Sequence, residues 1–550
     1  MKHKILYKRM ASVVLAGSMV MGCLTGCGEV KPNSNSSEIS TNASQEVVES
    51  SETVVVEEPA ELTYYGQLLD ASTTLETLND MEIMKAANEA TNCLVTYVHP
   101  SGASANEDFN LRIASMELDD IMEYSWGTYP GSPTQAIEDG VIIDLAPYLE
   151  KGYAPNFKKF LDENPEIAKQ VTTDDGVVYA FPCVGNESVS VTNGYIVRKD
   201  FLDKVGLDDP VTIADWEKML TAFKEQLGVT APFTGQTNHL FNPSYACFAG
   251  AFGTYVGYYV KDDKVQYGVL DESFKEYIAT MADWYAKGLI DPEIFGNDSN
   301  TSKSNILNSK SGAFFGAIGG GIGTYTTNAK ANENCDPDFE LVGVPYPVMN
   351  EGEEPQFISR AADVRAANQA AITTACEDIE AAMRYLDFWY SEEGHMMKNF
   401  GIEGLSYEMV DGVPTYTDLI LKNPDGLSVT AALGRYTRAS KPTVGVIDLQ
   451  YYYGYWQMEN QYDAMNTWNE HADNAVEVLL PAITHTPEES EEVAALTGPL
   501  STYVQEELTK FIMGTRKMDD WDNFIKSVKG MQADRIVELK QAAYERYKLR

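Results

Sequence analysis

Cys27 is the residue whose neighbours most clearly indicate a covalent reaction. It ends the tetrapeptide Leu24-Thr25-Gly26-Cys27, which fits the lipobox at which bacterial lipoproteins are processed. In that motif a small residue lets a peptidase approach the backbone, and the cysteine thiol receives a diacylglycerol. The motif therefore predicts that Cys27 is lipidated and becomes the first residue of the mature chain.

The segment ahead of Cys27 has the composition of a secretion signal. Its first nine residues include four Lys or Arg, and residues 11–24 are apolar or small without a charge. This run is shorter than the roughly 20 residues that a membrane-spanning helix needs, so residues 1–26 are predicted to be a removable signal peptide. An ordinary secretory signal with an incidental cysteine is the alternative. Two acyl chains would anchor the protein stably at the outer face of the cytoplasmic membrane.

No motif for metal, phosphate or redox chemistry is visible. The six His are scattered, and HExxH, CxxC and GxxxxGK[ST] patterns are missing, so neither a metal ion nor a cofactor is expected. Five Cys outside the signal region are odd in number and widely spaced, which predicts buried or free thiols rather than a disulfide framework. They are Cys93, Cys183, Cys247, Cys335 and Cys376.

The balance of charges excludes a nucleic-acid partner. The chain has 82 Asp+Glu against 41 Lys+Arg, a formal net charge of −41. Such a charge repels nucleic acid and anionic lipid. The acids are spread along the chain, as on a solvated surface.

Residues 27–60 are predicted to be a lipid-anchored, disordered tether. From residue 28 to residue 60 there is no aromatic residue, and Ser, Asn, Thr, Glu and Val dominate. Such a segment buries too little apolar surface to offset the entropy of ordering. Folded sequence begins at about residue 61.

The first part of the body alternates strand and helix patterns. Strands are predicted at 62–66, 92–100 and 119–125, and helices with apolar residues at helical spacing at 75–91 and 109–117. Alternation of this kind predicts βαβ units and a mostly parallel sheet, an α/β fold.

Later helices carry clearer end signals. Thr212 caps a helix with Asp215 three residues on and Gly228 as its stop. The C-terminal third is helix-rich: one helix is predicted over 379–394, and 488–514 contains Pro499 and is predicted to be two helices or a kinked one.

The order of motifs resembles the extracellular solute-binding lipoproteins of carbohydrate ABC importers, especially the large type of Gram-positive bacteria. After the lipobox and tether the motifs are DIMEYSW, AIEDGVIIDLAPYLE, DDGVVYAFP, WYAKGLIDP, GAFFGAIGGG, AAITTACEDIEAAMRYLDFWYSEEG and KFIMGTRKMDDWDNFIK. The resemblance covers nearly all of residues 61–550. Each motif is weak alone, and their order is the strong signal.

The resemblance implies a two-lobed, periplasmic-binding-protein-like fold of type II. Its N-lobe would comprise residues 61–185 plus about 355–415, and its C-lobe about 187–350 plus 416–550. An oligosaccharide would bind between the lobes, and the loaded monomer would dock on the permease subunits of an ABC transporter. Some relatives insert an acidic calcium loop after the helix that matches DWEKMLTAFKEQLG, whereas this chain continues directly to VTAPFTG, which argues against calcium there.

A sugar site needs flat aromatic rings for stacking and planar polar groups for hydroxyls. Ligands of open α/β sheets lie beyond the carboxyl ends of strands. Gln67, Trp126 and Tyr129 follow predicted strands, and Asn186 and Glu187 lie at a predicted crossover. For each a packing, turn or capping role is the alternative, and for Trp126 that alternative is the core.

Further candidates lie later in the chain, and each has a structural alternative in the core or on the surface. They are Tyr195, Phe252, Tyr255, Phe315, Arg360 and Glu403. The densest aromatic stretch is YYYGYWQMENQY, residues 451–462, in which Tyr455 and Trp456 are the preferred stacking platforms.

Two other functions remain open from the residues. A secreted glycoside-acting lipoprotein enzyme would need two carboxylates about 5–10 Å apart across the scissile bond, and no acidic motif singles out such a pair. A peptide-binding or adhesion lipoprotein would bind cell-wall or peptide ligands. The capture of a sugar without catalysis is the preferred function.

Overall fold

The computed structural model describes residues 58–100, 105–185, 191–242, 245, 248–359, 364–439 and 441–550. Cys27, the signal peptide and most of the tether lie outside these residues. Residues 58–550 form one compact unit. No helix in the described ranges combines the length and apolarity that a membrane crossing requires.

Strands from distant parts of the chain form the first sheet. Within the described residues it has six strands in the order β14-β4-β11-β3-β1-β2. β1, β2 and β3 are parallel, β11 is antiparallel to both β3 and β4, and β14 is parallel to β4. The bounds are β1 (Ala60–Tyr65), β2 (Cys93–Val98), β3 (Ile121–Tyr124), β4 (Phe181–Gly185), β11 (Val364–Ile372) and β14 (Gly445–Ile447).

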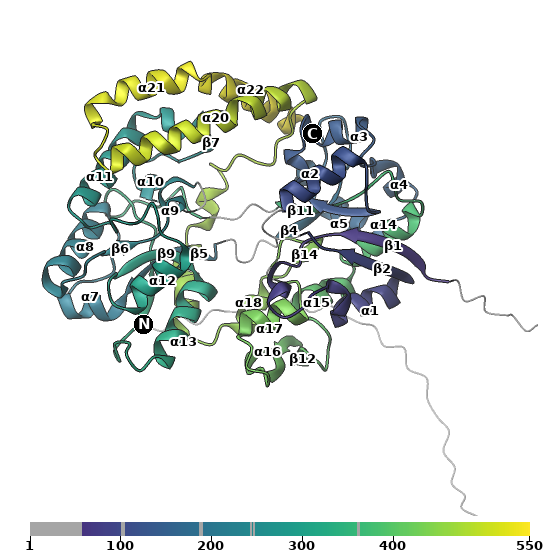
Figure 1. Cartoon of the computed structure of the whole chain (residues 1–550), viewed down its shortest axis with the longest axis horizontal. Coiled ribbons are helices and arrows are strands. Elements are labelled where there is room, and N and C mark those ends of the chain that lie inside the picture. Colours follow the sequence, from purple (N-terminus) through teal and green to yellow (C-terminus); the bar gives the residue numbers. More distant parts are fainter. Residues whose placement is uncertain are drawn as a thin grey trace, which may run out of the picture. The chain divides into compact units, whose positions relative to one another are not determined.

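Helices pack around this sheet and complete the first lobe (Figure 1). Phe157, Phe181 and Tyr385 are fully buried in its core. The bounds are α1 (Glu82–Thr91), α2 (Ala105–Ser115), α3 (Ser132–Glu138), α4 (Ala146–Glu150), α5 (Pro155–Glu163), α6 (Pro165–Val171), α14 (Ile379–Phe388), α15 (Glu392–Phe400) and α17 (Val429–Tyr436).

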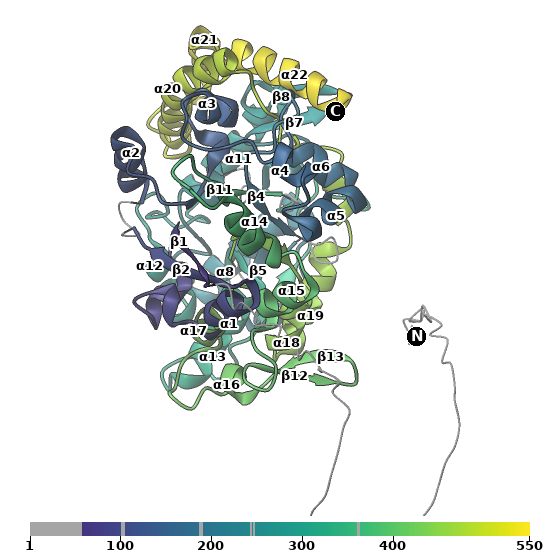
Figure 2. The same ribbon diagram turned by 90° about the vertical axis from the view of Figure 1, so that its right-hand side faces the viewer.

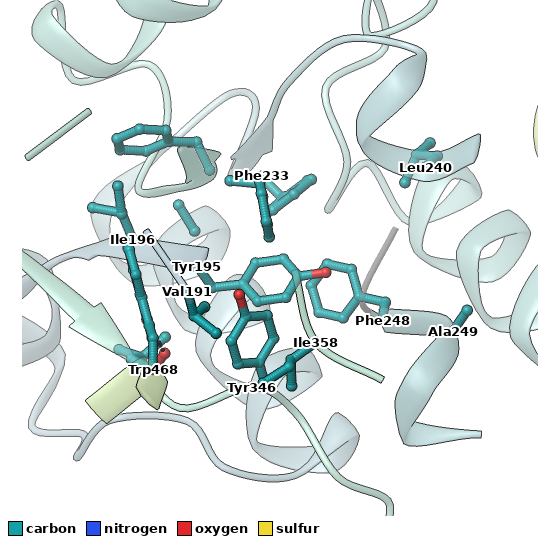
Figure 3. Close-up of a cluster of buried hydrophobic side chains, with 14 of the residues drawn as sticks. Val191, Tyr195, Ile196, Phe233, Leu240, Phe248, Ala249, Tyr346, Ile358 and Trp468 are labelled. Atoms are coloured by element: carbon teal, nitrogen blue, oxygen red, sulfur yellow. Dashed lines mark hydrogen bonds between the residues drawn. The ribbon is translucent and has the colours of Figure 1, made fainter. Parts of the chain in front are cut away.

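A smaller sheet forms the second lobe. Its order is β10-β5-β9-β6 over β5 (Asn193–Arg198), β6 (Phe233–Thr234), β9 (Ala313–Ala317) and β10 (Leu341–Val344). Figure 3 shows its core, where the ring of Tyr195 lies beside Phe248 and Tyr346. The helices that follow these strands in the chain are α7 (Lys199–Val205), α8 (Ile213–Leu227), α9 (Asn238–Phe241), α10 (Phe248–Ala251), α11 (Glu272–Ala286), α12 (Ser299–Leu307) and α13 (Thr324–Ala331).

The C-terminal region is helix-rich, as predicted. Long α20 packs on α11, and α22 packs on β8; Figure 2 shows α20 beside α3 of the first lobe. The bounds of the remaining elements are β7 (Tyr258–Lys261), β8 (Lys264–Tyr267), β12 (Tyr407–Val410), β13 (Val413–Tyr416), α16 (Asp418–Leu421), α18 (Gln450–Tyr455), α19 (Glu459–Asn469), α20 (Pro487–Ile512), α21 (Trp521–Gly530) and α22 (Ala533–Leu549).

The helix ends that carried explicit signals are confirmed. The Thr212 side chain accepts from the Asp215 amide, the reciprocal bond is present, and Gly228 is left-handed after α8. The prediction over 379–394 is wrong at its end. α14 stops at Phe388, and the Ser391 hydroxyl caps a new helix, α15, in which Gly394 is internal.

Residues 487–512 form one helix with Pro499 inside it, so of the two alternatives predicted for 488–514, two separate helices is wrong. Leu500, Val504 and Leu508 are buried after the proline and hold the second half in place. The aromatic stretch 451–462 is split between α18 and α19, since the backbone becomes extended at Trp456 and Met458.

The chain passes between the two sheets at one shared edge. In the described residues it leaves the first sheet after β4, returns from β10 to β11, and leaves again after β14 toward α19, which packs on β10. The sequence predicts residues 416–550 in the C-lobe, whereas β14 lies in the first sheet. The short run GVI pairs with β4 there, and three residues carry no sequence signal that could assign them to a sheet.

Candidate functional site

The ends of strands from both sheets face the crossovers. Ile447 of β14 pairs with Gly185 of β4, and Val364 of β11 pairs with Val184, so these ends lie together. The parallel strands β1 and β3 end at the same edge. In the second sheet Ala317, the end of β9, pairs with Asn193, the start of β5. By the rule for open α/β sheets, this is the edge where a ligand is expected.

Gln67 lies at this edge, two residues after the end of β1 at Tyr65, and is half-buried. Its backbone is held by Arg438, whose guanidinium donates to the Leu68 carbonyl at 3.1 Å and to the Gln67 carbonyl at 3.4 Å. Arg438 is 370 residues away from Leu68 in the chain. Arg438, in the last third of the chain, therefore positions Gln67, a candidate ligand contact in the first third.

Buried charges lie beneath this turn. Glu123 on β3 accepts from the Tyr64 hydroxyl at 2.9 Å, and Lys398 donates to the carbonyl and hydroxyl of Thr443. Burial raises the pKa of Glu123, and the positive charge of Arg438 is the largest opposing influence. Burial lowers the pKa of Lys398. The hydrogen bond between Tyr64 and Glu123 ties the end of β1 to β3 from inside the lobe.

Tryptophan offers no exposed stacking surface. All seven Trp are described, and each is at most 4% exposed. The Trp126 indole donates to the Met122 and Gln369 carbonyls and packs beside Tyr129, whose hydroxyl donates to Asp139. This placement favours the core alternative for Trp126 and Tyr129.

Tyr195 and Phe315 lie in the core of the second lobe. Tyr195 is 1% exposed and Phe315 is 3% exposed, and their rings meet edge to face with centroids 5.2 Å apart. Tyr245 and His239 contact the Phe315 ring. Burial lowers the pKa of His239 to about 4, so this imidazole is neutral near pH 7.

Tyr455 reaches the glycine turn that follows β9. A Cβ at Gly319 would lie 2.7 Å from the Tyr455 hydroxyl, so the glycine permits the close approach. Tyr455 is half-buried, and Trp456 is 2% exposed against the rings of Tyr452 and Tyr462. Tyr455 is thus the better placed of the two predicted platforms.

Three of the remaining candidates are described by the structure. Tyr255 stacks on Phe357 with centroids 5.5 Å apart, and Phe252 packs against Tyr277. Glu403 is exposed before the hairpin of β12 and β13. Asn186, Glu187 and Arg360 lie outside the described residues.

A cavity of about 230 Å³ opens at the end of β3. Ser125 and Thr128 line it from the turn after β3, Gln369 lines it from β11, and Thr484 and His485 line it from the segment before α20. The cavity therefore lies between the first lobe and the C-terminal region. In the described part of the chain, no group of three His, Cys, Asp or Glu side chains is placed to hold a metal ion.

The sequence reasoning missed Arg438, Ser132, Gln369 and His485. Arg438 and His485 lie in irregular segments whose contacts are hundreds of residues away or on another lobe, and no periodic pattern marks them. Ser132 stands in the sequence Gly131-Ser132-Pro133, a signal that could have found it.

The cysteines Cys93, Cys183, Cys335 and Cys376 are buried, and Cys247 lies outside the described residues.

The class of protein follows from comparison with known families. The model of the bacterial extracellular solute-binding protein family matches residues 73–396, more than half of the chain. The chain belongs to this family.

Two known proteins are similar to this chain in sequence. The fructooligosaccharide ABC transporter substrate-binding protein FusA of Streptococcus pneumoniae serotype 4 is 24% identical over 484 residues, 82% of this chain and 85% of FusA. Lipoprotein LipO of Bacillus subtilis is 24% identical over 339 residues, 58% of this chain and 62% of LipO.

Solved structures confirm the predicted two-lobed α/β fold. Alginate-binding protein AlgQ2, solved without calcium ion, superposes with a TM-score of 0.73 at 22% identity, over 89% of this chain and 98% of AlgQ2. FusA in complex with kestose gives a TM-score of 0.70 at 21% identity, over 89% of this chain and 99% of FusA. At these identities the likeness shows the fold alone.

Proposed function

We propose that this protein captures an oligosaccharide at the shared edge of its two lobes and delivers it to the permease of an ABC transporter. The observation that carries the proposal is the similarity to FusA, a fructooligosaccharide ABC transporter substrate-binding protein, over 82% of this chain and 85% of FusA. The structure of this chain also supports the proposal, because the strand ends of both sheets meet at the crossovers. Closure of two lobes around a ligand is the motion that this type of fold performs.

Binding without catalysis is the preferred form of this function. The family is defined by solute binding, and no acidic motif in the sequence singles out a pair of carboxylates. The secreted glycoside-acting enzyme and the peptide or adhesion lipoprotein are the competing functions. They differ in outcome: the enzyme turns a glycan over, and the peptide-binding protein responds to peptides alone.

The test is a thermal-shift screen of residues 28–550 against kestose, maltotriose, lacto-N-tetraose and an alginate trisaccharide, with peptides and amino acids as controls. A sugar that binds only the native state raises the melting temperature. At a sugar concentration of 100 times Kd, it adds about 2.7 kcal/mol to the free energy of unfolding. A shift with one glycan class supports the proposal. Shifts with peptides alone overturn it.

The lipid anchor is proposed on the lipobox, and similarity to the lipoprotein LipO supports it. Changing Cys27 to Ser is expected to release the protein into the medium, because the thiol that would carry the lipid is gone. Partition between detergent and aqueous phases measures this. The matched control is Cys23→Ser, four residues earlier, which should stay with the cells; equal partition of both variants would contradict the assignment of Cys27.

A further inference from the structure

We infer that Asp174 of the first lobe, together with Arg546 and Arg550 at the end of α22, forms an ionic latch that stabilises the lobe arrangement of this structure. The proposed function concerns what binds between the lobes. The latch concerns what sets the position of the lobes before a ligand arrives. It consists of side chains of this chain alone and needs no ligand.

Asp174 belongs to the first lobe through the loop that carries it. This loop is closed by a β-bridge between Thr172 and Val178. Val171 and Val178, at its two ends, are buried in the same hydrophobic cluster as Phe181 of β4. The Asp174 carboxylate therefore moves with the first sheet.

Arg546 and Arg550 belong to the second lobe, because α22 packs on β8 and β8 leads into α11. The Gln541 side chain of α22 accepts from the Val265 amide of β8 at 2.6 Å, and Val265 is buried in the same hydrophobic cluster as the second sheet. Arg546 also donates to Glu489 of α20 at 3.0 Å. The two guanidinium groups therefore move with the second lobe.

Both guanidinium groups meet the same carboxylate. Arg546 Nε donates to Asp174 Oδ2 at 2.6 Å, and Arg550 Nε donates to Asp174 Oδ1 at 2.8 Å. Arg550 also donates to the carbonyls of Lys169 and Thr172, at 2.9 Å and 2.6 Å. Each oxygen of Asp174 thus accepts from a different arginine, and the end of α6 is held as well.

These ion pairs are better placed than ordinary surface pairs. A single exposed pair contributes little to stability, whereas networks with good geometry contribute more. The side chains are 20% exposed at Asp174, 30% at Arg546 and 8% at Arg550, so water screens their charges only in part. Because Asp174 is shared, the loss of its one charge breaks both ion pairs.

The rest of this contact between the lobes is incompletely packed. The cavity of about 230 Å³ lies in it, and Thr484, which lines the cavity, accepts from Arg550. Contacts between domains that are polar in this way permit relative motion, unlike a large apolar interface. The latch can therefore favour one arrangement of the lobes without fusing them.

Single-molecule FRET of residues 28–550 without ligand tests the latch. The dyes are attached through an azide-bearing unnatural amino acid at Lys159 of α5 and Lys218 of α8, which are exposed positions on the two lobes. Wild type is expected to show one main distance at low salt. Asp174→Asn is expected to raise the population of other distances about tenfold, which corresponds to about 1.4 kcal/mol.

Salt provides a second readout. At about 1 M salt the Debye length falls to about 3 Å, so wild type should shift toward the distance distribution of Asp174→Asn, whereas that variant should change little. The matched control is Glu492→Gln, which breaks an ion pair with Arg535 between α20 and α22 of the same lobe. It should behave as wild type at both salt concentrations.

Arg546→Gln removes one of the two ion pairs and should give a smaller change than Asp174→Asn. Added to Asp174→Asn it should have little further effect, because its partner charge is already gone. Circular dichroism confirms that each variant is folded.

Two results would overturn the latch. One is a wild-type distance distribution in folded Asp174→Asn and Arg546→Gln at both salt concentrations. The other is an equal shift in Glu492→Gln. Since the measurement uses no sugar, failure of the latch is distinguishable from failure of the proposed function.

Discussion

Replacing Arg438 by Met is expected to lower the free energy of unfolding by about 3–5 kcal/mol, because it leaves the buried Glu123 carboxylate without its main positive neighbour. It also removes both hydrogen bonds to the turn at Gln67, so sugar affinity should fall as well. Urea unfolding followed by circular dichroism measures the stability, and titration with the bound sugar measures the affinity.

This loss should depend on pH. The folded state of the variant holds the Glu123 proton more tightly than the unfolded chain does, since burial raises the pKa of that carboxyl. Stability therefore falls as pH rises through the folded pKa of Glu123, and the destabilisation should be larger at pH 8 than at pH 5. The control is Arg435→Met. Arg435 lies three residues before Arg438 in the chain, and its guanidinium contacts the Tyr436 ring. Equal losses for both variants at all pH values would contradict the role of Arg438.

Replacing Trp468 by Ala is expected to cost about 3–5 kcal/mol of stability. The ring is 1% exposed and lies over Gly194 of β5 and Gly343 of β10, where a Cβ would meet it at 2.3 Å and 3.1 Å. Its N–H donates to the Val344 carbonyl at 2.9 Å. The ring thus fastens α19 to the second sheet beside the crossovers, and its loss leaves a cavity that the two strands cannot close.

The control for Trp468 is Tyr453→Ala. Tyr453 is an aromatic residue of the neighbouring helix α18 and is 39% exposed, so its truncation should cost much less. Chemical denaturation of both variants measures the loss in free energy of unfolding that each substitution causes. A cost for Trp468→Ala of less than 1 kcal/mol would show that α19 is not fastened by this ring.

Sequence patterns predicted the architecture well where the signal is local. The capping box at Thr212 and Asp215 and the stop at Gly228 determine α8 almost residue by residue. Alternating strands and helices predicted the parallel part of the first sheet. The boundary between α14 and α15 was missed because Gly394 looked like a stop, whereas the Ser391 cap makes it the third residue of a new helix.

The candidate site was harder to predict, because aromatic residues serve the core as well as ligands. Trp126 follows a strand as a ligand contact would, but its N–H finds two carbonyls inside the lobe. Gln369 and His485 gave no signal, since their cavity forms only when a bulged strand and a segment more than a hundred residues later come together. Spacing along the chain does not contain that information.

The measurement that tests the central claim most directly is titration calorimetry of residues 28–550 with the sugar that gives the largest thermal shift, followed by mass spectrometry of the recovered sugar. The account predicts saturable binding of one sugar per protein and recovery of the sugar intact. Recovery of cleaved sugar would make the protein an enzyme. The absence of heat with every glycan that was screened would contradict the capture of an oligosaccharide.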